Sequence, residues 1–139
     1  MTARRPDPDA GCPCERSSSF GGVLTYARCC GRYLDDAATP APDAESLMRS
    51  RYTAYALRRD DYVLATWDES TRPAALRIDP GLAWTGLRVL SARTTGPDTA
   101  EVTFEASYTE RGGRTDRLRE RSRFTRRAGR WTYRDGDVT

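Results

Sequence analysis

Apolar side chains recur at helical spacing near the middle of the chain. Met48, Tyr52 and Tyr55 are four and three residues apart, which predicts an amphipathic helix that ends near Arg59. Asp43 precedes this run and is a good N-cap, because its carboxylate can accept a hydrogen bond from a free backbone N–H of the first turn.

A second, shorter helix is expected directly after the first. Asp60 can cap a helix that runs through Trp67, and Pro73 stops it. Residues 74–80 are expected to form one helical turn.

From Leu82 onward the hydrophobic period changes to two, which is typical of strands. Turn residues separate four expected strands, over residues 84–94, 100–110, 115–126 and 130–135. Helices followed by an antiparallel meander indicate an α+β fold with the helices packed on a curved antiparallel sheet. A curved sheet closed by helices leaves a cone-shaped cavity, which is a candidate binding pocket.

The third expected strand carries different residues on its two faces. Leu118 marks the buried face, so Glu120 and Ser122 are carried inward beside it. A carboxylate that faces a core needs a partner, and Arg51 or Arg88 could supply one.

The sequence leaves two interpretations of Glu120 open. It can belong to a buried Glu–Arg or Glu–Tyr network that fixes the fold, or it can bind a ligand or act as an acid/base in the cavity. On the last strand Asp135 is expected to share a face with Tyr133, which would place a second carboxylate near the cavity mouth. The candidate ligand-binding residues, of which the aromatic ones can equally be core, are Arg51, Tyr52, Tyr55, Trp67, Glu120 and Ser122.

The outward face of the same strand is a row of arginines, Arg117, Arg119, Arg121 and Arg123. This row can be a solvated sheet face or a stripe that binds the phosphates of a nucleic acid. Base stacking requires exposed aromatic residues among the arginines, and the aromatic residue of this strand faces the other way. Nucleic-acid binding is therefore the weaker alternative.

The composition excludes several catalytic designs. The chain has no His, Lys, Asn or Gln, and all 23 basic residues are Arg. No His general base, Schiff-base Lys or phosphate-loop Lys is therefore available. Any chemistry must use Asp, Glu, Arg, hydroxyl groups, thiols or a bound metal.

All four cysteines lie in the first thirty residues, as Cys12 and Cys14 and then as Cys29 and Cys30. The N-terminus lacks the apolar stretch of a secretory signal, and no apolar run is long enough to span a membrane, so we expect a cytoplasmic protein. Thiols in that reducing compartment favour a metal site over disulfides. Four thiolates suit a structural Zn²⁺, since they leave no open position for water.

The cysteine pattern resembles the SEC-C motif, the zinc-binding segment at the end of the SecA translocation ATPase. The spacer between Cys14 and Cys29 is longer here, at 14 residues, and the usual Gly-Ser-Gly turn is absent. In SecA this segment docks onto other proteins, so the resemblance implies a protein partner for the zinc segment.

Longer blocks of the chain resemble the YchJ-like family of bacterial proteins, in residues 29–34, 44–55, 65–73 and 119–136. The family commonly has His where this chain has Asp68. The resemblance implies a zinc knuckle joined to a nuclear-transport-factor-two-like (cystatin-like) domain. The expected organisation is a disordered tail over residues 1–10, a four-cysteine knuckle over 11–34, a linker over 35–42 and the main domain over 43–139.

Three functions follow as hypotheses from these features. The first, which we favour, is a non-enzymatic zinc-binding protein whose domain binds a small ligand or a protein partner. The second is an enzyme that uses Glu120 in the cavity. The third is a nucleic-acid-binding module that uses the arginine row.

Overall fold

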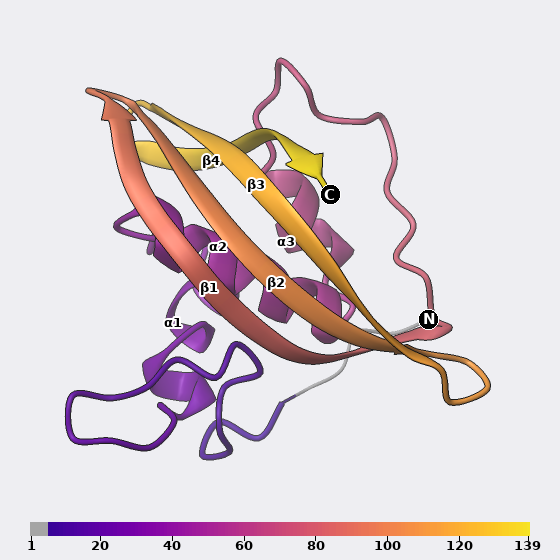
Figure 1. Cartoon of the computed structure of the whole chain (residues 1–139). Helices are drawn as coiled ribbons and strands as arrows, with labels where there is room; N and C mark the ends of the chain where they lie inside the picture. The colour runs from indigo at the N-terminus through magenta and orange to yellow at the C-terminus, as the bar shows by residue number, and fades with distance from the viewer. Residues whose placement is uncertain (1–5) are drawn as a thin grey trace.

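A computed structural model describes residues 6–139 and confirms the α+β fold class (Figure 1). Short helices precede a single sheet along the chain. A 3-10 turn η1 (Tyr26–Arg28) and helix α1 (Gly31–Leu34) belong to the cysteine-rich segment, and α2 (Ala44–Ala56) and α3 (Asp60–Ala65) follow.

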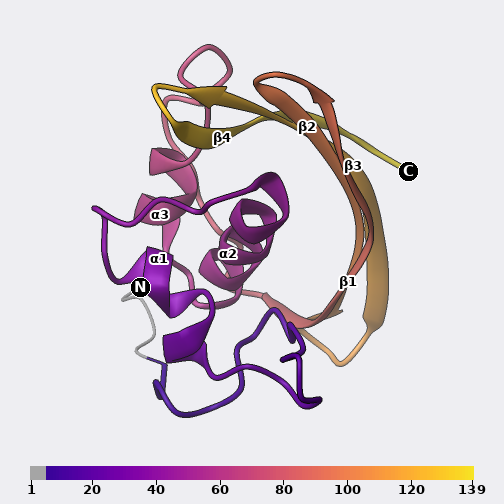
Figure 2. The ribbon, with the colours of Figure 1, turned by 90° about the vertical axis from the view of Figure 1, so that its left-hand side faces the viewer.

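The sheet is an antiparallel meander of four strands in the order β1-β2-β3-β4. The strands are β1 (Leu82–Gly96), β2 (Thr99–Glu110), β3 (Thr115–Arg127) and β4 (Arg130–Val138). Figure 2 shows that the sheet curves around α2, which lies against its concave face. The expected curved sheet with helices packed on it is therefore present.

The main core lies between α2 and this concave face. Leu47 of α2, Val102 of β2 and Phe124 of β3 are almost completely buried, together with Val63 of α3. The predicted alternation along β2 places its apolar residues inward, as expected of a strand with one buried face.

The helices agree with the prediction at their starts better than at their ends. The Asp43 carboxylate accepts a 2.7 Å hydrogen bond from Ser46 N, so the predicted N-cap is confirmed. The first helix ends at Ala56 rather than near Arg59, because Arg58 takes a positive φ of 60° that cannot continue a helix.

Two further helix predictions are wrong. The second helix ends at Ala65, and Asp60 is its first residue while Arg59 holds the cap position. Residues 74–80 form no helical turn. So short a segment gains too few hydrogen bonds to offset the cost of starting a helix, and its final proline would end the turn.

A β-bulge corrects the predicted position of Asp135. Adjacent residues Arg123 and Phe124 of β3 pair with Asp135 and Tyr133 of β4, so Arg134 has no opposite residue. The pairing is regular up to Tyr133, which keeps the inner face opposite Phe124, and the extra residue after it moves Asp135 to the outer face. The prediction that they share a face is therefore wrong.

The start of the described chain is attached to the cysteine-rich segment. Of the expected disordered tail, residues 1–5 lie outside the described residues. The carbonyls of Pro8 and Ala10 accept hydrogen bonds of 3.0 and 2.8 Å from the backbone N–H groups of Ala27 and Tyr26. None of the helices within residues 6–139 has the length and apolar character needed to cross a membrane.

Candidate metal centre and cavity

The four cysteines are brought together by two short folded pieces, which we call the cysteine knuckle (residues 11–34). Cys12 and Cys14 lie at one end of a hairpin whose strands are joined by a hydrogen bond of 2.9 Å from Cys12 N to Leu24 O. Cys29 follows the turn η1, and Cys30 directly precedes α1. The long spacer forms this hairpin, so it does not separate the two cysteine pairs.

The four sulfur atoms lie within 4.8 Å of one another, and all four side chains are buried. Cys14 Sγ is 3.5 Å from Cys29 Sγ, and Cys29 Sγ is 4.0 Å from Cys30 Sγ. A tetrahedron of thiolates at about 2.3 Å from a central zinc has edges of about 3.8 Å. The cluster therefore has the size that a four-thiolate metal site requires, and it could hold a metal ion.

The electrostatics of the cluster also favour a cation at its centre. Hydrogen bonds from the neighbouring thiols, first of all from Cys14, lower the pKa of Cys12. The hydrogen bonds with Cys12 and then with Cys14 are the largest causes that raise the pKa values of Cys29 and Cys30. A few thiolates so close together oppose further ionisation, and a bound cation would remove that opposition.

The knuckle is anchored on one side of helix α2. Cys12 Sγ lies 3.8 Å from the hydroxyl of Thr53, which is fully buried. Arg49 donates a 3.0 Å hydrogen bond from Nη1 to the Cys14 carbonyl and forms a 2.9 Å ion pair with Glu45. These contacts attach the cysteine cluster directly to the helix that lines the cavity.

A cavity of about 340 Å³ lies between α2 and the concave face of the sheet. Most of its wall is apolar or aromatic, with contributions from Met48, Trp67, Trp84, Phe104, Leu118 and Phe124. The six residues predicted as ligand-binding from the sequence all lie on this wall: Arg51, Tyr52, Tyr55, Trp67, Glu120 and Ser122. Their contact with a ligand stays a prediction.

Arg51 is a buried cation in the wall of this cavity, with 6% of its surface exposed. Its Nη1 donates hydrogen bonds of 2.7 Å to the Val63 carbonyl and 2.8 Å to Thr66 Oγ1. The guanidinium carbon lies 5.1 Å from the ring centroid of Trp67 and 4.6 Å from that of Tyr133. Two aromatic rings and two oxygen acceptors therefore fix the orientation of the guanidinium.

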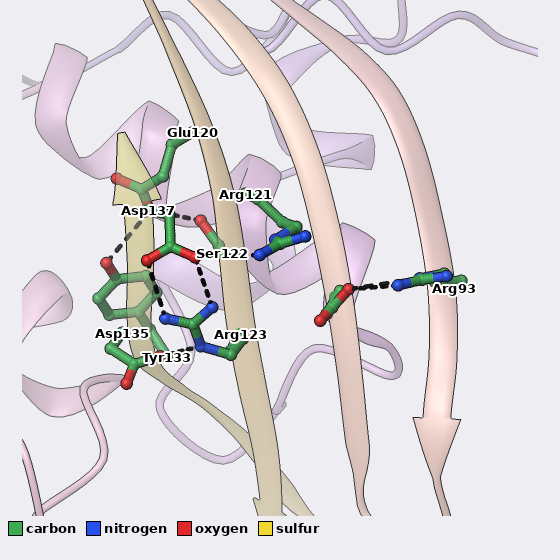
Figure 3. A network of polar contacts seen from close by, with 9 residues as sticks. Arg93, Glu120, Arg121, Ser122, Arg123, Tyr133, Asp135 and Asp137 are labelled. Atoms are coloured by element: carbon green, nitrogen blue, oxygen red, sulfur yellow. Dashed lines mark hydrogen bonds and ion pairs between the residues drawn. The ribbon is translucent and has the colours of Figure 1, made fainter. Parts of the chain in front are cut away.

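Glu120 meets neither of the two arginines expected as its partners. Among residues 6–139 it forms no ion pair with Arg51, and Arg88 is exposed on the opposite face of the sheet. Ser122 Oγ and the Tyr133 hydroxyl donate to Glu120 Oε2 instead, the latter over 3.1 Å (Figure 3). Burial raises the pKa of Tyr133, which keeps its hydroxyl protonated as a donor.

The outward arginine row is paired with acids of the neighbouring strands. Glu105 of β2 lies 3.6 Å from Arg117 and 3.3 Å from Arg119. On the other side Asp137 of β4 lies 3.1 Å from Arg121 and 2.8 Å from Arg123, which also contacts Asp135 (Figure 3). This pairing reduces the positive potential that a phosphate-binding stripe would need.

The residues that form two buried polar contacts were not identified from the sequence. The Tyr133 hydroxyl donates to Glu120 over 3.1 Å, so the Glu–Tyr network left open by the sequence is present, but the alternation of apolar residues did not identify this tyrosine. Asp68 is 1% exposed and forms a 2.7 Å ion pair with Arg127, so its carboxylate has a structural partner.

Comparison with known proteins gives a consistent result. The family model described as "YchJ, middle NTF2-like domain" matches residues 43–136. A protein named UPF0225 from Polaromonas sp. (strain JS666) is 56% identical over 132 residues, covering 94% of this chain and 95% of the relative. One from Xanthomonas campestris pv. campestris is 51% identical over 130 residues, with coverage of 92% and 95%.

Two solved structures share the fold over nearly the whole chain. The solution structure of a SEC-C motif containing protein from Rhodopseudomonas palustris has a TM-score of 0.78 and 32% identity, covering 94% of this chain and 99% of that one. The crystal structure of a SEC-C motif containing protein from Psychrobacter arcticus has a TM-score of 0.79 and 25% identity, with coverage of 95% and 84%. Both the knuckle and the curved-sheet domain therefore have structural counterparts.

Proposed function

The chain belongs to the YchJ-like family, whose middle domain is NTF2-like, and on that premise we propose that it binds Zn²⁺ in the knuckle and a small ligand in the cavity. The zinc is structural and the ligand-binding domain performs the function. The knuckle contacts one side of α2, and another side of that helix forms part of the cavity wall.

The chemistry of the donor set supports zinc. Four buried sulfur atoms within 4.8 Å of one another match the donor set that proteins use for structural Zn²⁺, and the solved relatives are described as SEC-C motif containing proteins. Bound there, Zn²⁺ supplies cross-linking of the knuckle rather than a reactive water, because four thiolates fill its coordination sphere.

The cavity is the observation that carries the proposed ligand binding. Its volume of about 340 Å³ falls in the range of about 300–1,000 Å³ that is usual for small-molecule pockets. An apolar wall with a few fixed polar groups is also usual for such pockets. Arg51 and Glu120 are those polar groups here.

To test whether the cavity binds a small ligand, the zinc-loaded protein is titrated with uncharged 2-naphthalenemethanol and the amide NMR shifts are monitored. We expect shifts in the cavity-lining segments of α2, β2 and β3. The Ala106→Phe variant fills the cavity from β2 and should abolish them. Thr103→Phe is the matched control because it adds the same ring to the outer face of the same strand.

The proposal fails if the probe produces no shifts at the cavity at millimolar concentration. It also fails if Ala106→Phe, shown to be folded by its amide spectrum, binds the probe as well as Thr103→Phe does.

A further inference from the structure

The cavity contains a cation whose best hydrogen-bonding edge is unused. Nη1 of Arg51 is occupied by Val63 and Thr66, whereas Nε and Nη2 have no hydrogen-bond partner within residues 6–139. These two nitrogens form the side-on fork of a guanidinium, which matches the two oxygens of a carboxylate.

This unused edge is accessible from the cavity rather than sealed in protein. Across the described part of the chain, Trp67 Nε1 is the side-chain polar atom that is both fully enclosed and unpaired, and no nitrogen of Arg51 is in that state. Because Arg51 lines the cavity and is otherwise buried, its unpaired edge can meet a molecule that occupies the cavity.

The surroundings of Arg51 lack a direct counterion. Among residues 6–139 it forms no ion pair, and its neighbours are two aromatic rings, a hydroxyl and a carbonyl. A buried guanidinium without a paired anion is costly to desolvate, which is the physical reason why burial lowers the pKa of Arg51. An anionic ligand would compensate that cost.

Glu120 limits how much negative charge the ligand can carry. Its carboxylate lies on the same cavity wall, where Ser122 and Tyr133 hold it. A ligand with two negative charges would be repelled by Glu120 more strongly than one with a single charge.

From these observations we propose that the cavity binds a monocarboxylate with an aromatic or apolar body, and that its carboxylate is held by the Nε–Nη2 edge of Arg51. The body of the ligand packs against the rings of Tyr52, Tyr55 and Trp84, which contact one another and line the same cavity as Arg51. This inference rests on the proposed function and assigns its ligand class.

A pair of ligands that differ only in charge tests the assignment on the unmodified protein. We expect 2-naphthoate to bind at least about tenfold more tightly than 2-naphthamide in isothermal titration, because charge-assisted bonds form only with the carboxylate. The Arg51 Nε–H signal should shift with 2-naphthoate.

Two variants that should change the affinity for 2-naphthoate in opposite directions complete the test. Arg51→Gln replaces the guanidinium by a shorter, uncharged amide, and it should weaken the binding of 2-naphthoate by about tenfold while changing that of 2-naphthamide by less than about twofold. Glu120→Gln removes the charge that repels the ligand and should strengthen the binding of 2-naphthoate by about threefold or more. If Arg51→Gln does not fold, the comparison of 2-naphthoate with 2-naphthamide and the effect of Glu120→Gln decide whether the carboxylate assignment holds.

The outcomes distinguish failure of the carboxylate assignment from failure of small-ligand binding. Equal affinity for 2-naphthoate and 2-naphthamide would overturn the carboxylate assignment and leave small-ligand binding in place. No binding of either compound, together with no shifts from 2-naphthalenemethanol, would overturn both.

Discussion

At the scale of single residues, Asp68 shows how one buried carboxylate joins three parts of the chain. It accepts hydrogen bonds from Ser70, from Thr132 over 3.2 Å and from Arg127 over 2.7 Å. These contacts, with that from Ser70 the largest, lower the pKa of Asp68 from 3.8 to about 2. The segment after α3 is thereby fixed to strands β3 and β4.

We predict that Asp68→Asn lowers the free energy of unfolding by about 1–3 kcal/mol at neutral pH. The native pKa is depressed, so the ionised carboxylate contributes its full stability above about pH 4, and this contribution falls as the pH drops toward 2. Urea unfolding of both proteins from pH 7 to pH 2 should show a difference that shrinks with acidity. A difference independent of pH would contradict this account.

A second residue-scale prediction concerns the space around Glu120. A methyl group at Gly136 would lie 2.5 Å from Glu120 Oε2, so no side chain fits there while Glu120 keeps its place. Gly136→Ala should displace Glu120 and destabilise the protein by about 1–3 kcal/mol in urea unfolding. Gly113→Ala tests a different effect, since nothing lies within 4 Å of its added methyl and only its φ of 89° opposes the change. Wild-type stability of Gly136→Ala would contradict the tight packing of Glu120 against Gly136.

Single residues were predictable where the strand is regular. Glu120 and Ser122 were expected to face inward because β3 alternates without interruption beside β2, and both line the cavity. The partners of Glu120 were not predictable, because hydrogen bonding depends on the relative placement of strands and helices. The predicted position of Asp135 was wrong because one extra residue in β4 moves its side chain to the other face of the sheet.

At the scale of elements, local signals account for the start of α2 and tertiary contacts account for the shape of β4. The Asp43 cap is a local signal, read correctly from the sequence. The bulge at Arg134 is held from outside the sheet, since Thr71 Oγ1 donates 2.6 Å to the Arg134 carbonyl and Asp68 N donates 2.7 Å to the Tyr133 carbonyl. Contacts between distant segments leave no pattern in the sequence.

The cap gives a prediction for helix α2. Asp43→Ala removes the acceptor for Ser46 N and should lower the free energy of unfolding by about 1 kcal/mol. Glu69→Ala is the matched control, because Glu69 is an exposed acid with no hydrogen bond or ion pair among residues 6–139, and its effect should stay below about 0.5 kcal/mol. Equal effects of the two changes in thermal unfolding would argue against the cap.

At the scale of the whole molecule, helix α2 connects the knuckle to the cavity. Thr53 and Arg49 contact the cysteine segment, while Arg51 and Tyr52 on another side of the same helix line the cavity. The fold class was predictable because each element has a clear period, and the convergence of the cysteines was predictable from their chemistry. The direct attachment of the knuckle to α2 was not.

This arrangement predicts that removal of the metal affects the cavity. Chelation should lower the unfolding midpoint by on the order of 10 °C, because the knuckle then loses the cross-link that holds it folded. Affinity for 2-naphthoate should fall severalfold as α2 loses its support. Re-addition of Zn²⁺ should restore both, and an unchanged affinity in the metal-free protein would show that the two sites are independent.

Whether the knuckle holds zinc is decided by the metal content of untagged protein purified under reducing conditions, with the reactive thiols counted in parallel. We predict one zinc per chain and four protected thiols, which become reactive when the metal is chelated. Protein without metal whose four thiols react freely would contradict the zinc assignment, since the four sulfur atoms would then come together for a reason other than binding a metal.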